Sequence, residues 1–414
     1  MIPALVISIP WPLVPQDQAH PVGNSWGEYQ EYSGDPSGAY LHPGVDVMGV
    51  TSGKEVRAVA SGWVKAWMSL GGDIYWRVAT SDNNTSDWSD GWLYAHIDPN
   101  RYHVNVGDQV STGTTIGYLV VWPVPGFDHC HFARIRHHGT NWNDAGWRFI
   151  RNPLVDLAPN TDTVKPIFES TGMSGSCNFA FRRNNSSIYL SPDSLYGKVD
   201  VIAKIHDKFG ISWGYPTYER IGVYRISYEV KGAVPLTLSF LFRDTLNYNS
   251  YGIVYTIYEY DNQLQTQGNY EAREYYYIVT NTDGDSTVET SDSLEAWDTS
   301  VLPDGEYWFV VQAEDEHGNV KRDSCLVKTR NGNPGADEGG TPSAFQMGPR
   351  VFLNESWVKV PLEWPEPLLY DVSGKKVEGI YGNEAGSYRI APEASGVYFL
   401  VLKGKRLKML KLSQ

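Results

Sequence analysis

Several features are scarce in this 414-residue chain, and each scarcity excludes a class of protein. No apolar run approaches the roughly 20 residues that a membrane-spanning helix needs, so the sequence predicts no integral membrane segment. Positive charge is in short supply, because 34 Lys and Arg stand against 48 Asp and Glu and the net charge is −14. This balance argues against a nucleic-acid partner, whose phosphates have to be neutralised. Three cysteines are too few for a disulfide-stapled mini-domain, and they lack the CxxC spacing of a thiolate zinc site.

Two of the cysteines, Cys177 and Cys325, leave two interpretations open. They pair across the middle of the chain under oxidising conditions, or they are two unpaired, buried thiols.

Residues 1–13 contain an apolar stretch without a basic n-region, and this stretch is either a clipped or mis-started signal peptide or a first strand. The cellular compartment therefore has to be inferred from other features.

Aromatic residues, glycine and proline are abundant. The chain has 27 Tyr, 15 Trp, 40 Gly and 24 Pro, whereas charged residues make up only 20%. β-Branched and aromatic runs punctuated by Gly and Pro are typical of short strands joined by turns. The low charge argues against long solvent-exposed helices, and the composition argues against disorder over most of the chain. The sequence predicts an all-β protein.

The distribution of histidine divides the chain. Eight of the ten histidines lie in residues 1–160, where we expect the chemistry. Residues 161–330 contain four runs that alternate with period two, as the strands of a sandwich do. These runs are 198–205, 224–230, 236–242 and 307–315. A Gly-, Pro- and Asp-rich stretch at 331–346 is predicted to be a linker, and short strands return in 347–414.

The most informative pattern is His129-Cys130-His131. In a strand, residues i and i+2 face the same side. Both imidazoles are therefore predicted to point into one site, and the Cys130 side chain is predicted to point away from it.

Two further elements carry residues of matching chemistry. His42 and Asp46 stand four residues apart around a glycine turn, and His96 lies in the apolar frame of Tyr94-Ala-His-Ile. Zn²⁺ accepts imidazole nitrogen and carboxylate oxygen in a tetrahedral shell, and a catalytic site leaves one position for water. Two histidines and one aspartate would give the three-ligand arrangement of a metal-dependent hydrolase.

The order of these motifs resembles the lysostaphin/LytM family of zinc endopeptidases, which cut peptide bonds of bacterial peptidoglycan. Over residues 41–135, LHPGVDVMG is similar to the family's HxGxD signature, LYAHI to its tyrosine-alanine-histidine element and HCHFARI to its terminal HxH. GKEVRAVASGWV from Gly53 resembles its strand pair, and VNVGDQVSTGTTIGYL from Val104 resembles its paired-glycine hairpin. The resemblance implies a β-rich, duplicated-hybrid-motif-like catalytic domain with this core.

Carried over position by position, the resemblance implies roles for five residues. His42, Asp46 and His131 correspond to the zinc ligands, and His96 and His129 to the two catalytic histidines that do not bind the metal. Bound Zn²⁺ lowers the pKa of its water towards about 7, and the two further histidines stabilise the tetrahedral intermediate or move its proton. All five positions are filled, whereas binding-only relatives in this family have typically lost ligands.

The sequence also departs from the family pattern. The loop before His129 reads Val-Val-Trp-Pro-Val-Pro-Gly-Phe-Asp over 120–128 instead of being Gly-, Ser- and Thr-rich, and Ala133 stands where the family often has Glu. A polar insertion at 81–91 is expected to extend a loop beside the cleft. These changes affect the bond specificity more than the metal centre.

Other histidines and the tryptophans receive an ordinary structural interpretation. The remaining histidines of the segment are expected to take no part in the site, and those after the HxH strand are expected in a solvent-facing turn. They are His20, His103, His137 and His138. Most tryptophans are predicted to pack in cores, and Trp122 and Trp142 are the two candidates for stacking on a sugar.

The later segments carry weaker patterns. Residues 304–319 resemble the end of an immunoglobulin-like or fibronectin-like module of bacterial surface proteins. The region 161–330 would hold one or two such modules. Its sequence shows no convergent polar cluster, so we interpret the region as a spacer. Residues 368–379 and 395–412 resemble type IX secretion sorting domains, and the alternative is a plain β module with a charged edge strand.

The sequence thus predicts a secreted or cell-surface, monomeric zinc endopeptidase acting on peptidoglycan peptides or similar surface peptides. A non-hydrolytic cell-wall binding or regulatory protein with a structural zinc site is the alternative, and an adhesin with a passenger peptidase domain is a third possibility. Residues 1–40 contain an Asn and a Trp that are hypothesised to reach the metal and occlude the cleft. The bond that is cut, and whether the wall is the producer's own, stay open.

Overall fold

The computed structural model describes most of the chain. The described residues are 8–32, 35–50, 54–85, 87–270, 272–332, 346–347, 351–352, 356–359, 367–371, 373, 375–382, 387–402 and 405–411. The chain divides into two compact units. One consists of Met1–Ala180, Ile202–Asp292 and Tyr307–Leu326, and the other of Phe181–Val201, Ser293–Glu306 and Val327–Gln414. The predicted division into consecutive segments stays a prediction.

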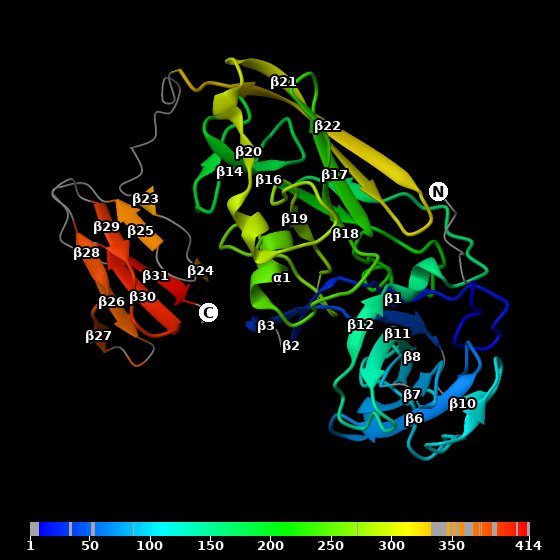
Figure 1. Cartoon of the computed structure of the whole chain (residues 1–414). Coiled ribbons are helices and arrows are strands. Elements are labelled where there is room, and N and C mark those ends of the chain that lie inside the picture. The colour runs from blue at the N-terminus through cyan, green and yellow to red at the C-terminus, as the bar shows by residue number, and fades with distance from the viewer. Residues whose placement is uncertain are drawn as a thin grey trace. The chain divides into compact units, whose positions relative to one another are not determined.

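An eight-stranded antiparallel sheet forms the framework of the N-terminal part (Figure 1). Its order is β1-β4-β11-β8-β7-β6-β9, and β12 pairs with β11. The strands are β1 (Val22–Asn24), β4 (Val45–Met48), β6 (Gly62–Ser69), β7 (Trp76–Ser81), β8 (Trp88–Ala95), β9 (Gln109–Val110), β11 (His129–His138) and β12 (Arg148–Arg151). Every residue of β4 and the last five of β8 are buried, so the centre of the sheet is covered on both faces.

Two predictions for this part need correction. Residues 104–119 do not form a hairpin, because β9 pairs with β6 whereas β10 (Thr115–Tyr118) pairs with β5 (Glu55–Arg57). The turn between them contains Gly113 at φ +88°, a left-handed conformation that lets the chain leave one sheet for another. The polar insertion is not all loop either, since β8 begins at Trp88 and pairs along its length with β11.

The middle of the chain forms further sheets. A four-stranded sheet has the order β18-β17-β21-β22, and a six-stranded sheet has β13-β16-β14-β15 with β19 and β20 on β16. Their bounds are β13 (Ile167–Glu169), β14 (Ala180–Arg183), β15 (Tyr189–Leu190), β16 (Lys198–His206), β17 (Arg225–Val230), β18 (Val234–Leu241), β19 (Tyr276–Ile278), β20 (Trp297–Asp298), β21 (Gly305–Glu314) and β22 (Val320–Thr329). All four predicted period-two runs are strands, namely β16, β17, β18 and β21. The immunoglobulin-like assignment of this region stays a prediction.

The C-terminal part is a small β-sandwich. One sheet has the order β23-β25-β29-β28 and the other β24-β31-β30-β26-β27. The strands are β23 (Gln346–Met347), β24 (Val351–Phe352), β25 (Ser356–Lys359), β26 (Leu368–Asp371), β27 (Lys376–Val377), β28 (Ile380–Gly382), β29 (Ser387–Ile390), β30 (Gly396–Leu402) and β31 (Lys405–Lys411). Val358 and Ile390 from one sheet share a buried core with Leu369, Leu400 and Met409 from the other. The predicted linker falls on 331–346, of which 333–345 lie outside the described residues.

The prediction of an all-β protein is confirmed. Among the described residues the α-helix is α1 (Tyr251–Ile257), and β2 (Tyr29–Tyr32) and β3 (Asp35–Leu41) complete the strands. No helix among these described residues is long and apolar enough to cross a membrane.

Cys177 and Cys325 form a disulfide with Cα atoms 5.5 Å apart, which decides between the two interpretations of these cysteines. Cys130 is a buried free thiol.

Candidate active site

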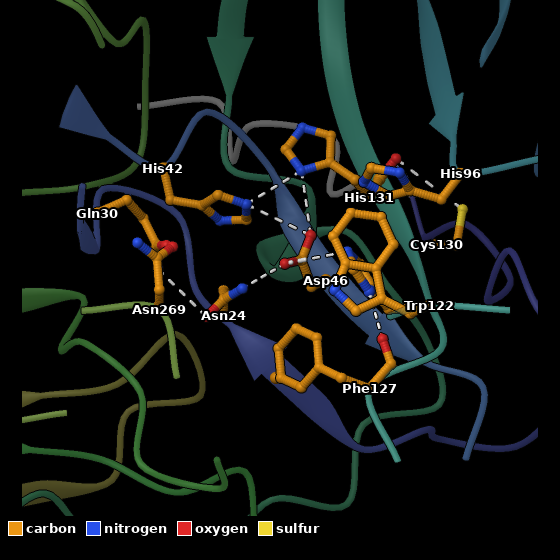
Figure 2. Close-up of polar contacts among 12 residues, drawn as sticks. Asn24, Gln30, His42, Asp46, His96, Trp122, Phe127, Cys130, His131 and Asn269 are labelled. Atoms are coloured by element: carbon orange, nitrogen blue, oxygen red, sulfur yellow. Dashed lines mark hydrogen bonds and ion pairs between the residues drawn. The ribbon is translucent and has the colours of Figure 1, made fainter. Parts of the chain in front are cut away.

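The sheet order brings the predicted site residues together. Asp46 on β4 and His131 on β11 are direct cross-strand partners, and His131 also pairs with the last residue of β8, Ala95. His42 lies just before β4, and His96 follows β8 directly. Figure 2 shows the side chains of His42, Asp46 and His131 pointing toward one another.

Three atoms of these side chains form a compact donor set. His131 Nδ1 lies 3.0 Å from His42 Nε2 and 3.0 Å from Asp46 Oδ1, and His42 Nε2 lies 3.3 Å from the same carboxylate oxygen. The exposed fractions of the three side chains are 6% for His42, 4% for Asp46 and 13% for His131. Two nitrogens and one oxygen facing a common point match the donors of a Zn²⁺ site, so the residues fit the metal that the resemblance implies.

Gly44 in the turn between His42 and β4 makes room for this arrangement. A Cβ atom at residue 44 would lie 2.6 Å from both Cε1 and Nε2 of His131. Any larger side chain would therefore displace the His131 ring. The glycine of the HPGVD motif is required by packing against a ring that lies 87 positions later in the sequence.

Backbone carbonyls fix the protonation of three imidazoles. The Nδ1 atoms of His42, His96 and His129 lie 3.1, 2.7 and 2.6 Å from the carbonyl oxygens of Ser25, Ile74 and Phe127, respectively. A carbonyl oxygen only accepts hydrogen bonds, so each Nδ1 carries the proton and each Nε2 keeps its lone pair. A hydrogen bond of this kind orients the imidazole ring and fixes its tautomer.

Burial and charge set the ionisation of the donor set. Burial alone would raise the pKa of Asp46, but the neighbouring His129 and His42 and a hydrogen bond from His131 hold it well below its usual value. Burial alone would lower the pKa of His42, and the Asp46 carboxylate raises it instead. Burial lowers the pKa of His131 to about 4, so this ring is neutral and able to bind a metal at neutral pH.

The two histidines outside the donor set lie next to each other. The ring centroids of His96 and His129 are 4.5 Å apart, and the Trp122 indole contacts both rings at 4.5 and 4.7 Å. His96 has φ +66°, an uncommon backbone conformation for a residue other than glycine and one found at functional sites. Burial first, and then the electrostatic interaction with the neighbouring His129 ring, hold the pKa of His96 well below its usual value.

All five predicted residues line a cavity of about 760 Å³. Trp122 and Phe127 of the altered loop line it as well. The middle of the chain contributes to the wall as well, through Tyr248 and Tyr270, and no sequence motif predicted this contribution. Trp122 Nε1 donates a 2.7 Å hydrogen bond to the Tyr270 hydroxyl, and no local motif marks this tyrosine.

An outer network supports Asp46. Asn24 Nδ2 donates a short hydrogen bond to Asp46 Oδ2, so an asparagine of residues 1–40 does reach a predicted ligand. Arg273 has no exposed surface and donates to Asn24 Oδ1, and its Nη1 lies 3.7 Å from the buried carboxylate of Glu28. No sequence pattern indicated a role for Arg273 or Glu28.

Several secondary predictions were wrong. His137 is buried and pairs with Asp144, because β11 continues to His138 and alternation turns His137 inward. Trp142 is fully buried and is therefore no sugar platform. His103 and His138 are exposed as expected.

Comparisons with known proteins return structures only. No family model matches the sequence, and no curated protein does. The catalytic domain of the antimicrobial peptidase lysostaphin from Staphylococcus simulans matches 31% of this chain and 86% of its own length, at 22% identity and a TM-score of 0.23. A zinc-containing peptidase from Vibrio cholerae matches 28% of this chain and 33% of its own length, at 18% identity and a TM-score of 0.23. The catalytic domain of the prophage-encoded M23 protein EnpA from Enterococcus faecalis matches 29% of this chain and 84% of its own length, at 19% identity and a TM-score of 0.21. The similarity thus extends over about a third of this chain.

Proposed function

We propose that this protein is a zinc-dependent endopeptidase that hydrolyses peptide bonds of bacterial peptidoglycan. The observation that carries the proposal is the convergence of His131 Nδ1, His42 Nε2 and Asp46 Oδ1 in the wall of the cavity, beside two further imidazoles. Zn²⁺ held by these three residues would act as a Lewis acid toward a water molecule and a peptide carbonyl.

The chain's own groups supply the proton transfer. His96 and His129 both direct Nδ1 to a backbone carbonyl, which leaves Nε2 of each as a proton acceptor. An imidazole in this tautomer accepts the proton of an attacking water and returns it to the leaving amine. The Trp122 indole against both rings restricts their rotation and excludes water from that side.

The cavity fits a peptide substrate. Its volume of about 760 Å³ lies within the range of ligand sites in proteins. Aromatic side chains such as Tyr75, Trp122 and Tyr270 stand beside the polar donor set, so the wall offers stacking surfaces together with hydrogen-bond donors. A stem or cross-bridge peptide presents small side chains and amides that suit such a wall.

We place this activity outside the cytoplasm. The Cys177–Cys325 disulfide supports this location, because structural disulfides persist mainly in oxidising compartments.

The proposed sorting role of 347–414 is tested by fusing residues 340–414 to an inert reporter in a host with a type IX secretion system. Retention of the fusion in the periplasm would contradict the sorting role without affecting the peptidase proposal.

The deciding experiment combines zinc content with turbidity loss of purified peptidoglycan for the wild type, His129→Ala and the exposed-histidine control His103→Ala. We expect about one active-site zinc and lysis in the wild type and the control, and zinc without lysis in His129→Ala. The alternative, a non-hydrolytic binding protein, would be favoured by a different result. In that case the wild type would hold zinc and bind sedimented peptidoglycan but would not lyse it.

A further inference from the structure

A second cluster of ligand-type side chains lies outside the proposed active site. The carboxylates of Asp162 and Asp315 and the imidazole of His317 have potential ligand atoms that all lie within 4.8 Å of one another. Asp162 precedes β13, whereas Asp315 and His317 belong to the turn between β21 and β22. The interpretation of residues 161–330 as free of a convergent polar cluster was therefore wrong, because the members come from segments more than 150 positions apart.

The turn itself explains only part of the cluster. Asp315 Oδ1 accepts hydrogen bonds from the backbone N–H groups of His317 (2.8 Å) and Asn319 (2.9 Å), and Oδ2 accepts from Asn319 Nδ2 (2.7 Å). Asn319 Nδ2 also lies 3.2 Å from the Asp162 carbonyl oxygen, so the turn is held against the segment before β13. These bonds account for the orientation of Asp315 but leave the imidazole unexplained.

Buried polar atoms without partners point to a missing ligand. Nδ1 and Nε2 of His317 are both buried and make no hydrogen bond, and Nδ1 lies 3.8 Å from Asp162 Oδ2. Oδ1 of Asp207, a residue with 1% exposed surface, is also buried without a hydrogen bond. A buried polar atom left unpaired costs about 1–3 kcal/mol, and native proteins usually satisfy such atoms with water or an ion.

The charge around the cluster has one sign. The Asp207 carboxyl interacts with three further carboxylates, those of Asp315, Asp162 and Glu316. Among the described residues no Lys or Arg forms an ion pair with any of these four carboxylates. Buried carboxylates that form no ion pair with Lys or Arg favour a bound cation.

We propose that Asp162, Asp315 and His317 bind a divalent transition-metal cation, with Zn²⁺ as the best-suited ion. Imidazole nitrogen together with carboxylate oxygen suits Zn²⁺, whereas Ca²⁺ and Mg²⁺ take oxygen ligands. The site shares no residue with the proposed active site and does not depend on the proposed function.

The cation has a structural role. It ties the segment that carries Asp162 to the β21–β22 turn, close in sequence to Cys325 on β22, which is linked to Cys177. Its removal is expected to loosen this turn and lower the melting temperature without affecting the metal held by His42, Asp46 and His131.

Metal stoichiometry separates the two sites. The full-length wild type, His131→Ala, His317→Ala and the double variant are stripped with chelator, dialysed against Zn²⁺ and analysed for zinc. We expect two, one, one and no equivalents, and the control His103→Ala should keep two. One equivalent in the wild type together with none in His131→Ala would overturn the proposal, and so would an unchanged zinc content in a folded His317→Ala protein.

Thermal unfolding gives a second readout, in case His317→Ala folds poorly. In the stripped His131→Ala protein, Zn²⁺ at a concentration about a hundredfold above Kd should raise Tm by roughly 5 °C. This shift in Tm should be absent when His131→Ala is combined with either His317→Gln or Asp162→Asn. If Ca²⁺ in place of Zn²⁺ raised Tm, and raised it equally in the His317→Gln variant, the assignment of the imidazole as a ligand would be contradicted.

Discussion

Arg273 Nη2 donates a hydrogen bond of 2.7 Å to Asn24 Oδ1, although 249 positions separate the two residues. The same asparagine donates through Nδ2 to Asp46 Oδ2, so a buried guanidinium orients the amide that orients a predicted metal ligand. Glu28 stands 3.7 Å from Arg273 Nη1 and balances its charge in the interior. The wall of the site is therefore held by residues from two parts of the chain that lie 249 positions apart.

Loss of this support should weaken zinc binding. We expect Arg273→Met to lower zinc affinity by about 10- to 100-fold, because partners behind a ligand fix its orientation. Affinity is measured by competition with a chromophoric chelator. Arg273→Lys, which keeps the charge but loses the planar fork, should give a smaller loss in the same direction.

Arg182→Met is the matched control for that substitution. Arg182 is also a buried arginine and pairs with Asp200 at 2.8 Å, and neither residue belongs to the donor set. The control should lose stability but keep its zinc affinity. Equal affinity in Arg273→Met and wild type would refute the positioning role.

The two histidines of the HxH motif should respond differently to substitution. We expect His131→Ala to lose the zinc of the proposed active site, because its Nδ1 contacts both other donors. His129→Ala should keep that zinc and lose turnover by roughly 10²- to 10⁴-fold, the usual size of an acid–base contribution. Elemental analysis beside peptidoglycan lysis measures both, and equal zinc loss in the two variants would show that this division of roles is wrong.

Tyr270 should affect substrate binding rather than metal binding. Tyr270→Phe removes the acceptor of the Trp122 Nε1 hydrogen bond, a loss of roughly 0.5–1.5 kcal/mol. The indole that covers His96 and His129 becomes less restrained, and we expect KM to rise by about 2- to 10-fold with unchanged zinc content. Tyr102→Phe, outside the lining of the cavity, is the control, and an equal change in both variants would contradict the prediction.

The disulfide should contribute to stability. Cys177 and Cys325 are 148 positions apart, so their link removes much conformational freedom from the unfolded chain. The double substitution to Ser should lower the free energy of unfolding by about 2–5 kcal/mol in guanidinium titrations. Wild type in reductant should show the same loss, and an unshifted midpoint in both would rule out this contribution.

His20 should make stability pH-dependent. Burial lowers the pKa of this ring from 6.5, so the unfolded chain takes up the proton at a higher pH than the folded one. The contribution is fully present above pH 6.5 and is lost as the pH falls through the lowered folded-state value. His20→Gln should flatten the decline of the unfolding free energy below pH 6.5, whereas the exposed His103→Gln should not, and parallel curves for wild type and His20→Gln would exclude His20 as its source.

Local patterns in the sequence predicted the fold class and the common orientation of the two histidines in the HxH motif. Strand periodicity alone places His129 and His131 on one face, and Gly and Pro punctuation predicts the all-β architecture, because both depend on residues a few positions apart. These predictions succeed where the deciding contacts are local or follow a single strand register.

Only the tertiary structure decided which distant side chains meet. The contact of Arg273 with Asn24, the Tyr270 wall of the cavity and the pairing of Cys177 with Cys325 join segments more than 140 positions apart. The joining of Asp162 to the β21–β22 turn is of the same kind. No local period encodes such contacts, because they arise from the packing of whole sheets and of the loops between them.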